Sequence, residues 1–242
     1  MGKIGIIGSE GRMGQALVAA IAAAGSDLSG GIDQGGDPLA LARASDVLVD
    51  FSSPKALEAN LDAAAAAGIP IVVGTTGLEE RHHWLCDQAA QNTAVLQTGN
   101  TSLGVNMLAY LVREAASRLG EDWDIEIVET HHRMKVDAPS GTALLLGEAA
   151  AKGRGIDLAT SSERGRDGIT GARAKGAIGF ASLRGGLVTG DHTVHLFSDY
   201  EHISLRHHAE DRIVFAHGAV KAALWLVGKA AGRYSMAEVL GL

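Results

Sequence analysis

The first hundred residues alternate short apolar runs with longer alanine-rich segments, and this alternation constrains the fold more than any other feature of the chain. The apolar runs predict strands over residues 4–7, 28–32, 46–51, 70–73 and 94–97. The segments between them predict helices over residues 13–24, 38–44, 54–67 and 79–91. Strands that alternate with helices are joined by crossover connections and therefore run parallel. The sequence predicts an α/β domain built on a parallel sheet.

After residue 100 the pattern changes to longer strands in which apolar and polar residues alternate. These strands are expected over residues 124–130, 177–183, 192–197 and 201–208. Gly185-Gly186 and Asp199-Tyr200 are turn signals, and they favour hairpin-like connections between the strands. A helix is predicted over residues 142–151, and a strongly apolar one over 216–230. We therefore expect a second, α+β domain with a mixed or antiparallel sheet.

Composition excludes several classes of protein. The 242 residues are 46% hydrophobic and 20% charged, which is typical of a soluble globular protein. A net charge of −7 argues against nucleic acid as a partner, and no apolar run approaches the ~20 residues of a membrane span. The single cysteine, Cys86, excludes an internal disulfide and favours a reducing compartment, so we expect a cytoplasmic protein. A strand that begins near Lys3 leads us to expect no signal peptide.

The glycine-rich turn after the first strand, Gly8-Ser9-Glu10-Gly11-Arg12-Met13-Gly14, predicts a dinucleotide-binding site. Missing side chains at such a junction of strand, turn and helix let the backbone approach a pyrophosphate, as in Rossmann-like domains. The spacing is Gly-x-x-Gly-x-x-Gly rather than Gly-x-Gly-x-x-Gly, so an ordinary tight turn is the alternative. The residues expected to bind the cofactor here are Gly8, Ser9, Glu10, Gly11, Arg12 and Met13.

Asp33 follows the second predicted strand about 20 residues after this turn, where an acidic residue can hydrogen-bond the ribose hydroxyls of a dinucleotide. Its charge repels a 2′-phosphate, and the next residue, Gln34, offers no cation in compensation. This pattern favours NADH over NADPH. The alternative is that Asp33 is only a turn residue before Gly35-Gly36.

Two further loops leave the carboxyl ends of predicted parallel strands, where ligands bind in such sheets. We expect Gly74, Thr75 and Thr76 in the first loop, and Thr98, Gly99, Asn100 and Thr101 in the second, to line the nicotinamide side of a cofactor groove. Alternatively, each loop is only a strand-to-helix turn with a threonine N-cap.

Residues 131–143 carry a second candidate site. Two imidazoles and an amine, from His131, His132 and Lys135, precede the turn Pro139-Ser140-Gly141-Thr142. Ser140 and Gly141 lie where the predicted helix begins, so backbone N–H groups and the positive end of the helix point outward there. Such a helix start binds carboxylate or phosphate. The segment therefore predicts a binding site for a small acidic substrate.

The remaining histidines and arginines favour less specific interpretations. Six histidines lack the compact spacing with an acid or thiol that a metal site needs, so we expect no metal; they are His192, His195, His202, His207, His208 and His217. Their alternation favours a solvated or interfacial sheet face. Arg164, Arg166 and Arg173 lie among glycines, in a segment that either closes over an acidic substrate or is simply solvated.

Taken together, these motifs resemble the bacterial 4-hydroxy-tetrahydrodipicolinate reductase (dihydrodipicolinate reductase) family, which acts in the diaminopimelate route to lysine. The resemblance spans the chain, and both the order and the spacing of the motifs agree. The motifs are Gly11-Arg12-Met13-Gly14, Val49-Asp50-Phe51-Ser52, Gly74-Thr75-Thr76-Gly77, Ser102-Leu103-Gly104-Val105-Asn106, residues 131–143, residues 165–173 and residues 179–186.

The resemblance implies an NADH- or NADPH-dependent reduction of a small cyclic dicarboxylate. It makes His131 the general acid/base and Lys135 its partner cation. It assigns carboxylate binding to His132, Ser140, Gly141 and Thr142. It further implies a dinucleotide domain of residues 1–102 with 213–242, a substrate domain of residues 103–212, and a homotetramer assembled through the second sheet.

Two alternatives belong to other classes. A non-catalytic NAD-binding regulator would share the glycine-rich turn, but it does not explain the histidines and lysine beside an anion-binding helix start. Another small NAD-dependent oxidoreductase, such as an amino-acid dehydrogenase, would not need the full Pro-Ser-Gly-Thr turn.

Overall fold

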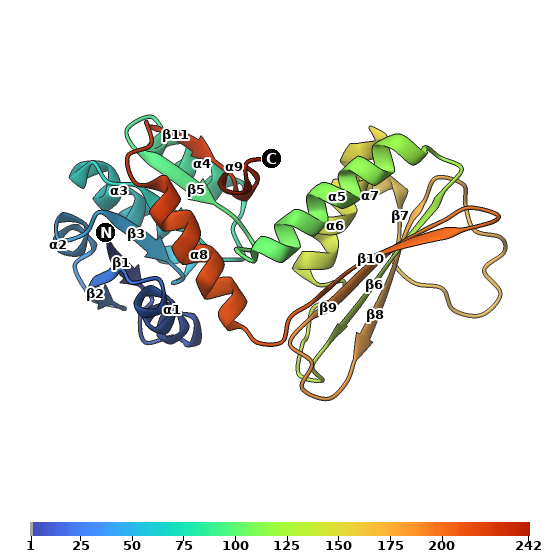
Figure 1. Ribbon diagram of the computed structural model, residues 1–242, viewed down its shortest axis with the longest axis horizontal. Helices are drawn as coiled ribbons and strands as arrows, with labels where there is room; N and C mark the ends of the chain where they lie inside the picture. The colour runs from blue at the N-terminus through green and yellow to red at the C-terminus, as the bar shows by residue number, and fades with distance from the viewer. Residues whose placement is uncertain (1) are drawn as a thin grey trace. The chain divides into compact units, whose positions relative to one another are not determined.

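The computed structural model describes residues 2–242, which form two compact units (Figure 1). The first unit runs to Leu103 and takes up Arg212–Leu242, and the second unit is Gly104–Asp211. Each unit has its own buried apolar core. Within residues 2–242, no helix combines the length and the apolar character that a membrane span requires.

The first unit contains a parallel sheet of six strands in the order β11-β5-β4-β3-β1-β2. The strands are β1 (Lys3–Ile7), β2 (Asp27–Ile32), β3 (Val47–Asp50), β4 (Ile71–Val73), β5 (Ala94–Gln97) and β11 (Gly232–Tyr234). The chain runs from β1 outward to β2 and then returns to β3 on the other side of β1. Ligands of open α/β sheets bind at such a reversal, outside the carboxyl ends of the strands. The predicted Rossmann-like sheet is confirmed.

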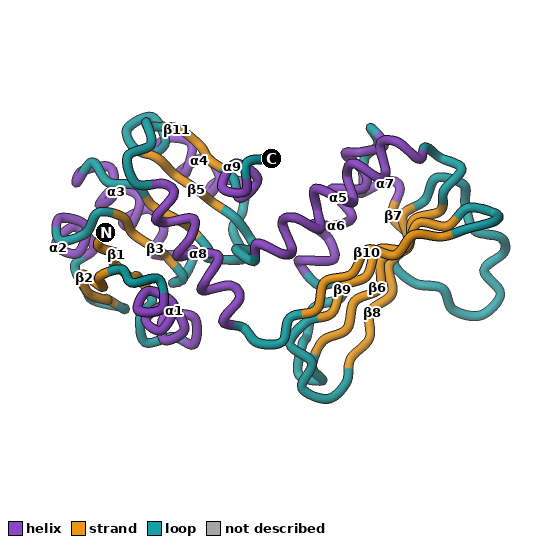
Figure 2. Tube along the Cα trace, in the orientation of Figure 1, coloured by secondary structure: helices purple, strands orange, loops and turns teal. Residues whose placement is uncertain are grey.

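Helices cover both faces of this sheet (Figure 2). The helices are α1 (Arg12–Ala23), α2 (Pro38–Arg43), α3 (Leu57–Ala67), α4 (Glu80–Ala89), α8 (Ile213–Leu226) and α9 (Met236–Leu240), with a 3₁₀ turn at Pro54–Ala56. Alternate residues of β1 enter different cores: Ile6 packs with α1 and α8, whereas Ile7 packs with α2, α3 and α4. Because both faces are buried, the central strands are continuous apolar runs, which is why the sequence predicts them well.

The second unit contains a mixed sheet of five strands in the order β10-β9-β6-β8-β7. The strands are β6 (Asp124–His131), β7 (Ser162–Glu163), β8 (Ile178–Arg184), β9 (Asp191–Phe197) and β10 (His202–His208). The helices are α5 (Leu103–Leu119), α6 (Gly141–Arg154) and α7 (Leu158–Ser161). Residues of α5 and α6 share one core with one face of the sheet, and no helix of the described residues covers the other face. The predicted second domain with a mixed sheet is confirmed.

The hairpin expected at Gly185-Gly186 is wrong. Strand β6 lies between β8 and β9, parallel to β8 and antiparallel to β9. The chain crosses from β6 through α6 to β8, and β9 then takes the other edge of β6, so the glycines form part of a longer loop across the end of β6. The turn at Asp199-Tyr200 does close a hairpin, in which β9 and β10 are antiparallel.

Two further differences from the sequence predictions concern helices. Helix α5 was not predicted, although Val105, Leu108, Val112 and Ala116 follow helical spacing and are buried. The apolar helix α8 ends at Leu226 rather than at residue 230. Its end is followed by Gly228 at φ +79°, a left-handed conformation that ends a helix.

Candidate functional site

The turn after β1 is tight and depends on its glycines. Gly8 has φ +87°, and a Cβ on Gly14 would lie 2.3 Å from the carbonyl oxygen of Gly8. Glycine is therefore required at both positions. The N-cap of α1 is Gly11, which has no side chain to occupy the free N–H groups of the helix start. The turn thus forms a cradle that fits the pyrophosphate of a dinucleotide.

Asp33 is part of this turn, although it follows β2. Its Oδ2 atom accepts hydrogen bonds from the hydroxyl of Ser9 and the backbone N–H of Glu10, both at 2.8 Å. The carboxylate therefore holds the glycine-rich turn against the end of β2. Among the described residues, nothing hydrogen-bonds to Oδ1 of Asp33 in the structure, so this oxygen can accept from a ribose hydroxyl.

The two threonine-containing loops are only partly open to a ligand. The hydroxyl of Thr75 is buried and lies 3.3 Å from Oδ1 of Asp50. The hydroxyl of Thr101 donates to the carbonyl oxygen of Phe215 in α8, at 2.7 Å. Thr76 and Gly99 are exposed, Gly74 and Asn100 are buried, and Thr98 is half-buried. Hence Thr75 and Thr101 can serve a cofactor through the backbone, while their hydroxyls hold the loops in place.

Asp50 is the buried centre of this region. It is fully buried, and its carboxylate accepts from the N–H and hydroxyl of Ser52 and from the amide of Asn60. Burial raises the pKa of Asp50, and these hydrogen bonds oppose that effect. The carboxylate ties the loops after β3 and β4 to α3.

The register of strands β8, β6, β9 and β10 in the five-stranded sheet creates the second site. On the face that packs against the helices, one row across the strands is apolar, with Phe180, Ile127 and Val194 side by side. Two residues further along, the next row is polar: Ser182, Glu129, His192 and His207. The row after that places Arg184 beside His131. The inward-facing side chains therefore change from apolar to polar at the end of the sheet where residues 132–140 begin.

Glu129 is the most connected residue of this site and is only 1% exposed. Arg184 donates to both of its oxygens, at 2.8 and 2.9 Å, and Nδ1 of His131 lies 2.5 Å from Oε2. The backbone N–H of Ser140 donates to Oε1 at 3.2 Å. Burial acts to raise the pKa of Glu129, but hydrogen bonds from Arg184, Ser182 and His131 outweigh it and lower the pKa to about 2. Glu129 is thus ionised at neutral pH.

His131 and His192 lie edge to face, with ring centroids 5.0 Å apart. His192 is 4% exposed, and its Nε2 atom lies 3.1 Å from the hydroxyl oxygen of Ser140. Burial lowers the pKa of His192 to about 4, and the neighbouring His131 contributes to the shift. Burial also lowers the pKa of His131, against the opposing effect of Glu129. Both rings are neutral at neutral pH in the absence of a ligand.

The helix start predicted at Ser140 is confirmed. Ser140 is the N-cap of α6, and its hydroxyl oxygen accepts from the N–H of Ala143. Gly141 is exposed and Thr142 is half-buried, so the first turn of α6 is accessible. Ser140 itself is buried, which restricts its hydroxyl to the contacts with α6 and His192.

Lys135 and His132 lie on the loop between β6 and α6. The ammonium of Lys135 is 2.8 Å from a carboxylate oxygen of Asp137, which lowers the pKa of Asp137. The backbone N–H of His132 donates to the carbonyl oxygen of Val188, in the loop after β8. That loop therefore holds the start of the segment between β6 and α6 in place. The structure brings His131, His132, Lys135, Ser140, Gly141 and Thr142 onto one continuous stretch at the end of β6 and the start of α6.

Sequence reasoning missed four residues of this site: Glu129, Ser182, Arg184 and His192. The interpretation of His192 as part of a solvated or interfacial face is wrong, because His192 occupies a buried position of β9 that faces the helices. The sequence does contain a signal for Glu129. It is an acidic residue at an inward-facing position of the predicted strand, and a buried charge needs a partner. The partners come from β8 and β9, which only the sheet register identifies.

Arg166 and Arg173 lie on the opposite face of the sheet. Both donate to Glu126 of β6, and Arg173 also pairs with Asp124. These contacts fix the segment that carries them at two points. Arg164 and Arg166 both line a cavity of about 430 Å³ that also includes Pro139 and Ser182.

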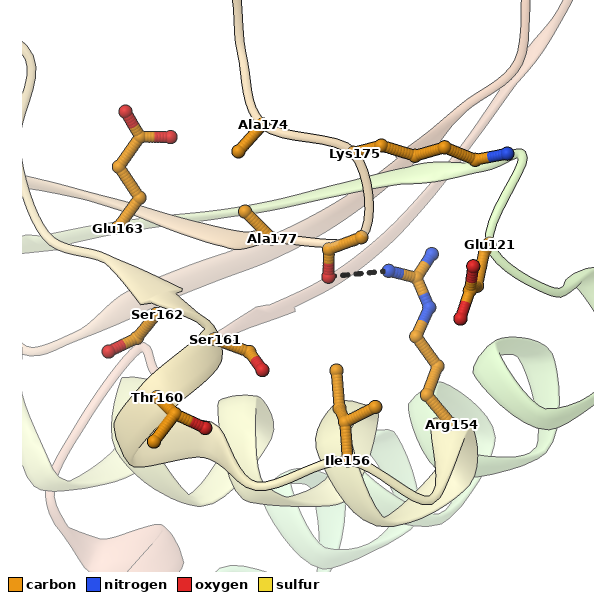
Figure 3. A pocket seen from close by; sticks show the side chains of 11 residues that line it. Glu121, Arg154, Ile156, Thr160, Ser161, Ser162, Glu163, Ala174, Lys175 and Ala177 are labelled. Atoms are coloured by element: carbon orange, nitrogen blue, oxygen red, sulfur yellow. Dashed lines mark hydrogen bonds between the residues drawn. The ribbon is translucent and has the colours of Figure 1, made fainter.

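A third region, shown in Figure 3, contains none of the predicted site residues. It is a cavity of about 410 Å³ lined by hydroxyl groups and by charges of both signs, among them Arg154 and Glu121. The guanidinium of Arg154 donates to backbone carbonyls of Gly120, Trp123 and Gly176, so it connects α6 to two loops. Within residues 2–242 no group of three or more His, Cys, Asp or Glu side chains could hold a metal.

A glycine cradle on a parallel sheet, together with a second unit that carries an acid–histidine pair beside a helix start, defines a two-domain oxidoreductase that uses a nucleotide cofactor. The family described as dihydrodipicolinate reductase, N-terminus, matches residues 2–101, and the family described as dihydrodipicolinate reductase, C-terminus, matches residues 104–240. The chain belongs to the dihydrodipicolinate reductase family.

Named relatives agree with this assignment. The chain is 56% identical to the 4-hydroxy-tetrahydrodipicolinate reductase of Zymomonas mobilis, over 99% of this chain and 97% of that protein. It is 50% identical to the enzyme of the same name from Bradyrhizobium diazoefficiens, over 98% and 96% of the two chains. The fold is similar to that of a dipicolinate-bound dihydrodipicolinate reductase from Paenisporosarcina sp. TG-14, with a TM-score of 0.76, 22% identity and 98% of both chains covered. The family resemblance expected from the sequence is confirmed.

The neutral state of His192 predicts a loss of stability on acidification. A histidine with a folded-state pKa near 4 and an unfolded value near 6.5 stabilises the fold fully above about pH 6.5 and loses that contribution between about pH 6.5 and 4. The difference corresponds to about 3 kcal/mol. We expect His192→Phe to make the urea-unfolding free energy of the second unit less dependent on pH across this window.

Thr193→Val is the matched control, because Thr193 is adjacent on β9, faces the other side of the sheet and does not titrate. An equal pH dependence in wild type and His192→Phe would show that His192 is not held neutral by the fold.

Proposed function

We propose that this protein reduces 4-hydroxy-tetrahydrodipicolinate, by way of dihydrodipicolinate, to tetrahydrodipicolinate with NADH or NADPH. Identities of 50–56% to reductases of that name support the assignment. The single observation that carries it is the shared contact of Glu129, whose carboxylate binds both the ring of His131 and the N–H of Ser140. One buried group thus holds a proton-transfer residue and an anion-binding helix start beside each other.

The helix start and the nearby cations fit a cyclic dicarboxylate. Backbone N–H groups at Gly141 and Thr142 can receive one carboxylate. Lys135 offers a positive charge for the other carboxylate, and both Lys135 and His132 offer hydrogen-bond donors. Lys135 has its ion pair with the half-exposed Asp137, and a substrate carboxylate can share or replace this partner. Ser140 contributes as the buried cap that holds this helix start in place.

His131 supplies the proton of the reduction. The cofactor, when bound, supplies hydride from C4 of its nicotinamide to a ring carbon, and one proton must be added to balance the charge. Because the substrate carries two negative charges, its arrival next to His131 favours the imidazolium form. Lys135, as the second cation, stabilises the negative charge of the substrate and positions the substrate ring. A histidine that gains its proton as the substrate binds is suited to act as the general acid.

The cofactor site proposed in the first unit consists of Gly8, Ser9, Glu10, Gly11, Arg12, Met13 and Asp33, with the loops at residues 74–76 and 98–101. The tight turn that Gly8 and Gly14 permit, and the N-cap Gly11 without a side chain, are the features that fit a pyrophosphate. We propose NADH as the preferred cofactor, because the free oxygen of Asp33 can accept from a ribose hydroxyl and its charge repels a 2′-phosphate.

We also propose that the protein is a homotetramer. The sheet face that no helix covers carries apolar side chains, including Val128, Leu183 and Phe197, of which Leu183 is 55% exposed. Exposed apolar surface of this kind is stabilised by burial against another subunit. The occupant we propose is the same face of further copies of this chain.

The proposed division of roles predicts the effect of removing either reacting side chain. His131→Ala and Lys135→Ala should each lower kcat by two or more orders of magnitude, because the proton donor or its partner cation is lost. The dissociation constant for NADH, measured by fluorescence titration, should change less than about threefold, because neither side chain belongs to the first unit.

Lys175→Ala is the control, since Lys175 also forms an exposed lysine–aspartate pair, with Asp122, but lies outside the proposed site. Equal losses of cofactor binding in the His131 and Lys135 variants would contradict the proposed roles.

The role of Asp33 predicts a shift in cofactor preference. In Asp33→Asn the repulsion of a 2′-phosphate is removed, while the shape of the side chain is kept. We expect the ratio of kcat/KM for NADH to that for NADPH to exceed one in wild type and to fall about tenfold in the variant. A wild-type ratio below one would refute the preference for NADH.

The proposed assembly predicts the mass of the particle in solution. Sedimentation of the wild type should give four times the mass of one chain, and Leu183→Glu should give a smaller particle, since a buried unpaired charge is costly. Leu111→Glu changes an exposed leucine of α5 and should leave the assembly intact. A monomeric wild type would disprove the tetramer.

A further inference from the structure

Two glutamates of strand β6 have similar chemistry but different surroundings. Glu126 faces the sheet side without helices and pairs with Arg166 and Arg173. Glu129 faces the helices, pairs with Arg184 and also contacts His131. Both carboxylates have lowered pKa values because of their arginine partners, despite an opposing effect of burial. Only Glu129 connects an arginine pair to the proposed reacting group.

We propose that Glu129 is the positioning residue of the site, which keeps the proton of neutral His131 on Nδ1 and thereby makes Nε2 the atom that exchanges a proton with the substrate. This inference rests on the proposed acid role of His131. It assigns to Glu129 no contact with substrate, because its two oxygens are already bound by Arg184, His131 and Ser140 and the side chain is buried.

The geometry around the ring of His131 supports this assignment. An ionised carboxylate only accepts hydrogen bonds, so the nitrogen 2.5 Å from it, Nδ1, carries a proton. On the other side of the ring the neighbouring backbone is Gly190, on which a Cβ would lie 3.1 Å from Nε2. Gly190 precedes β9 and has no side chain to cover Nε2, and within residues 2–242 no group hydrogen-bonds Nε2 in the structure. Nδ1 is therefore bound by Glu129, and Nε2 can exchange a proton with the substrate.

Arg184 determines the charge of Glu129. Two parallel hydrogen bonds from its guanidinium keep the buried carboxylate ionised. Four charged or titratable groups then face His131: Glu129 from β6, Arg184 from β8, His192 from β9 and Lys135 from the loop before α6. Glu129 is the only anion among them. Its removal leaves His131 next to two cations, and the imidazolium form becomes less favourable.

The ring protonation of wild type gives the first test. In protein with ¹⁵N-labelled histidine, NMR of the full-length enzyme at pH 8 should show His131 with its proton on Nδ1 and a bare Nε2. A bare Nδ1 with the proton on Nε2 would overturn the proposal. This readout needs no variant and no catalytic activity.

The second test compares the pKa of His131 in wild type, Glu129→Gln, Glu129→Asp and Glu126→Gln. Glu129→Gln should lower this pKa by at least about one unit, because the carboxylate charge 2.5 Å from Nδ1 is lost. The pH at which kcat/KM begins to fall on the alkaline side should move down with it, so activity at pH 8 should drop about tenfold. Glu129→Asp keeps the charge and should largely restore the wild-type profile.

Glu126→Gln is the matched control, since it removes a similar arginine-paired carboxylate from the same strand and should not change the pKa of His131. A purely structural role for Glu129 would reduce the yield of folded enzyme and leave the pKa of His131 unchanged, and that result would refute the proposal. If the wild type reduced no substrate while the ring protonation and the shift in the pKa of His131 were both as expected, the proposed function would fail, and the effect of Glu129 on the protonation of His131 would stand.

Discussion

The ion pair between the buried Glu129 and the partly exposed Arg184 is the interaction on which the site of the second unit depends. Loss of the arginine would leave the carboxylate buried without compensation, which costs about 3–5 kcal/mol in a fully buried pair. The same carboxylate binds the ring of His131 and the N–H of Ser140, so the pair also fixes the distance between the proposed acid and the helix start. The carboxylate of Glu129 therefore contributes both to the stability of the second unit and to the proposed proton transfer.

The first unit uses carboxylates in a related way. Asp33 holds the glycine-rich turn through Ser9 and Glu10, and Asp50 holds the loops after β3 and β4. In each case an acid at the carboxyl end of a strand hydrogen-bonds a neighbouring loop. Loops fixed in this way are already in shape before a ligand arrives, which lowers the entropic cost of binding. Asp33 retains one free oxygen for that ligand, whereas Asp50 is fully committed to the fold.

Much of this architecture follows from the sequence. The central strands of the first unit, β1, β3, β4 and β5, are apolar runs, and the glycine-rich turn, Asp33 and Ser140 lie where the sequence signals predict. The helix start at Ser140 was predictable because a serine N-cap acts within three residues of its own position.

Contacts across the sheet could not be predicted in the same way. The partners of Glu129 come from positions 11 and 55 residues away in the chain, and their meeting depends on the order β9-β6-β8. The sequence suggested instead a hairpin of the strands around Gly185-Gly186, which would separate Arg184 from His131. His192 illustrates the same limit, since a shift of one residue in register decides whether a strand residue is buried or solvated.

We propose that this register assembles a carboxylate-binding helix start beside His131. A crystal structure of the enzyme with dipicolinate tests this arrangement most directly. We expect one carboxylate within hydrogen-bonding distance of the N–H groups of Gly141 and Thr142, and Nε2 of His131 facing the ring. Dipicolinate bound elsewhere, with the first turn of α6 exposed to solvent, would contradict it.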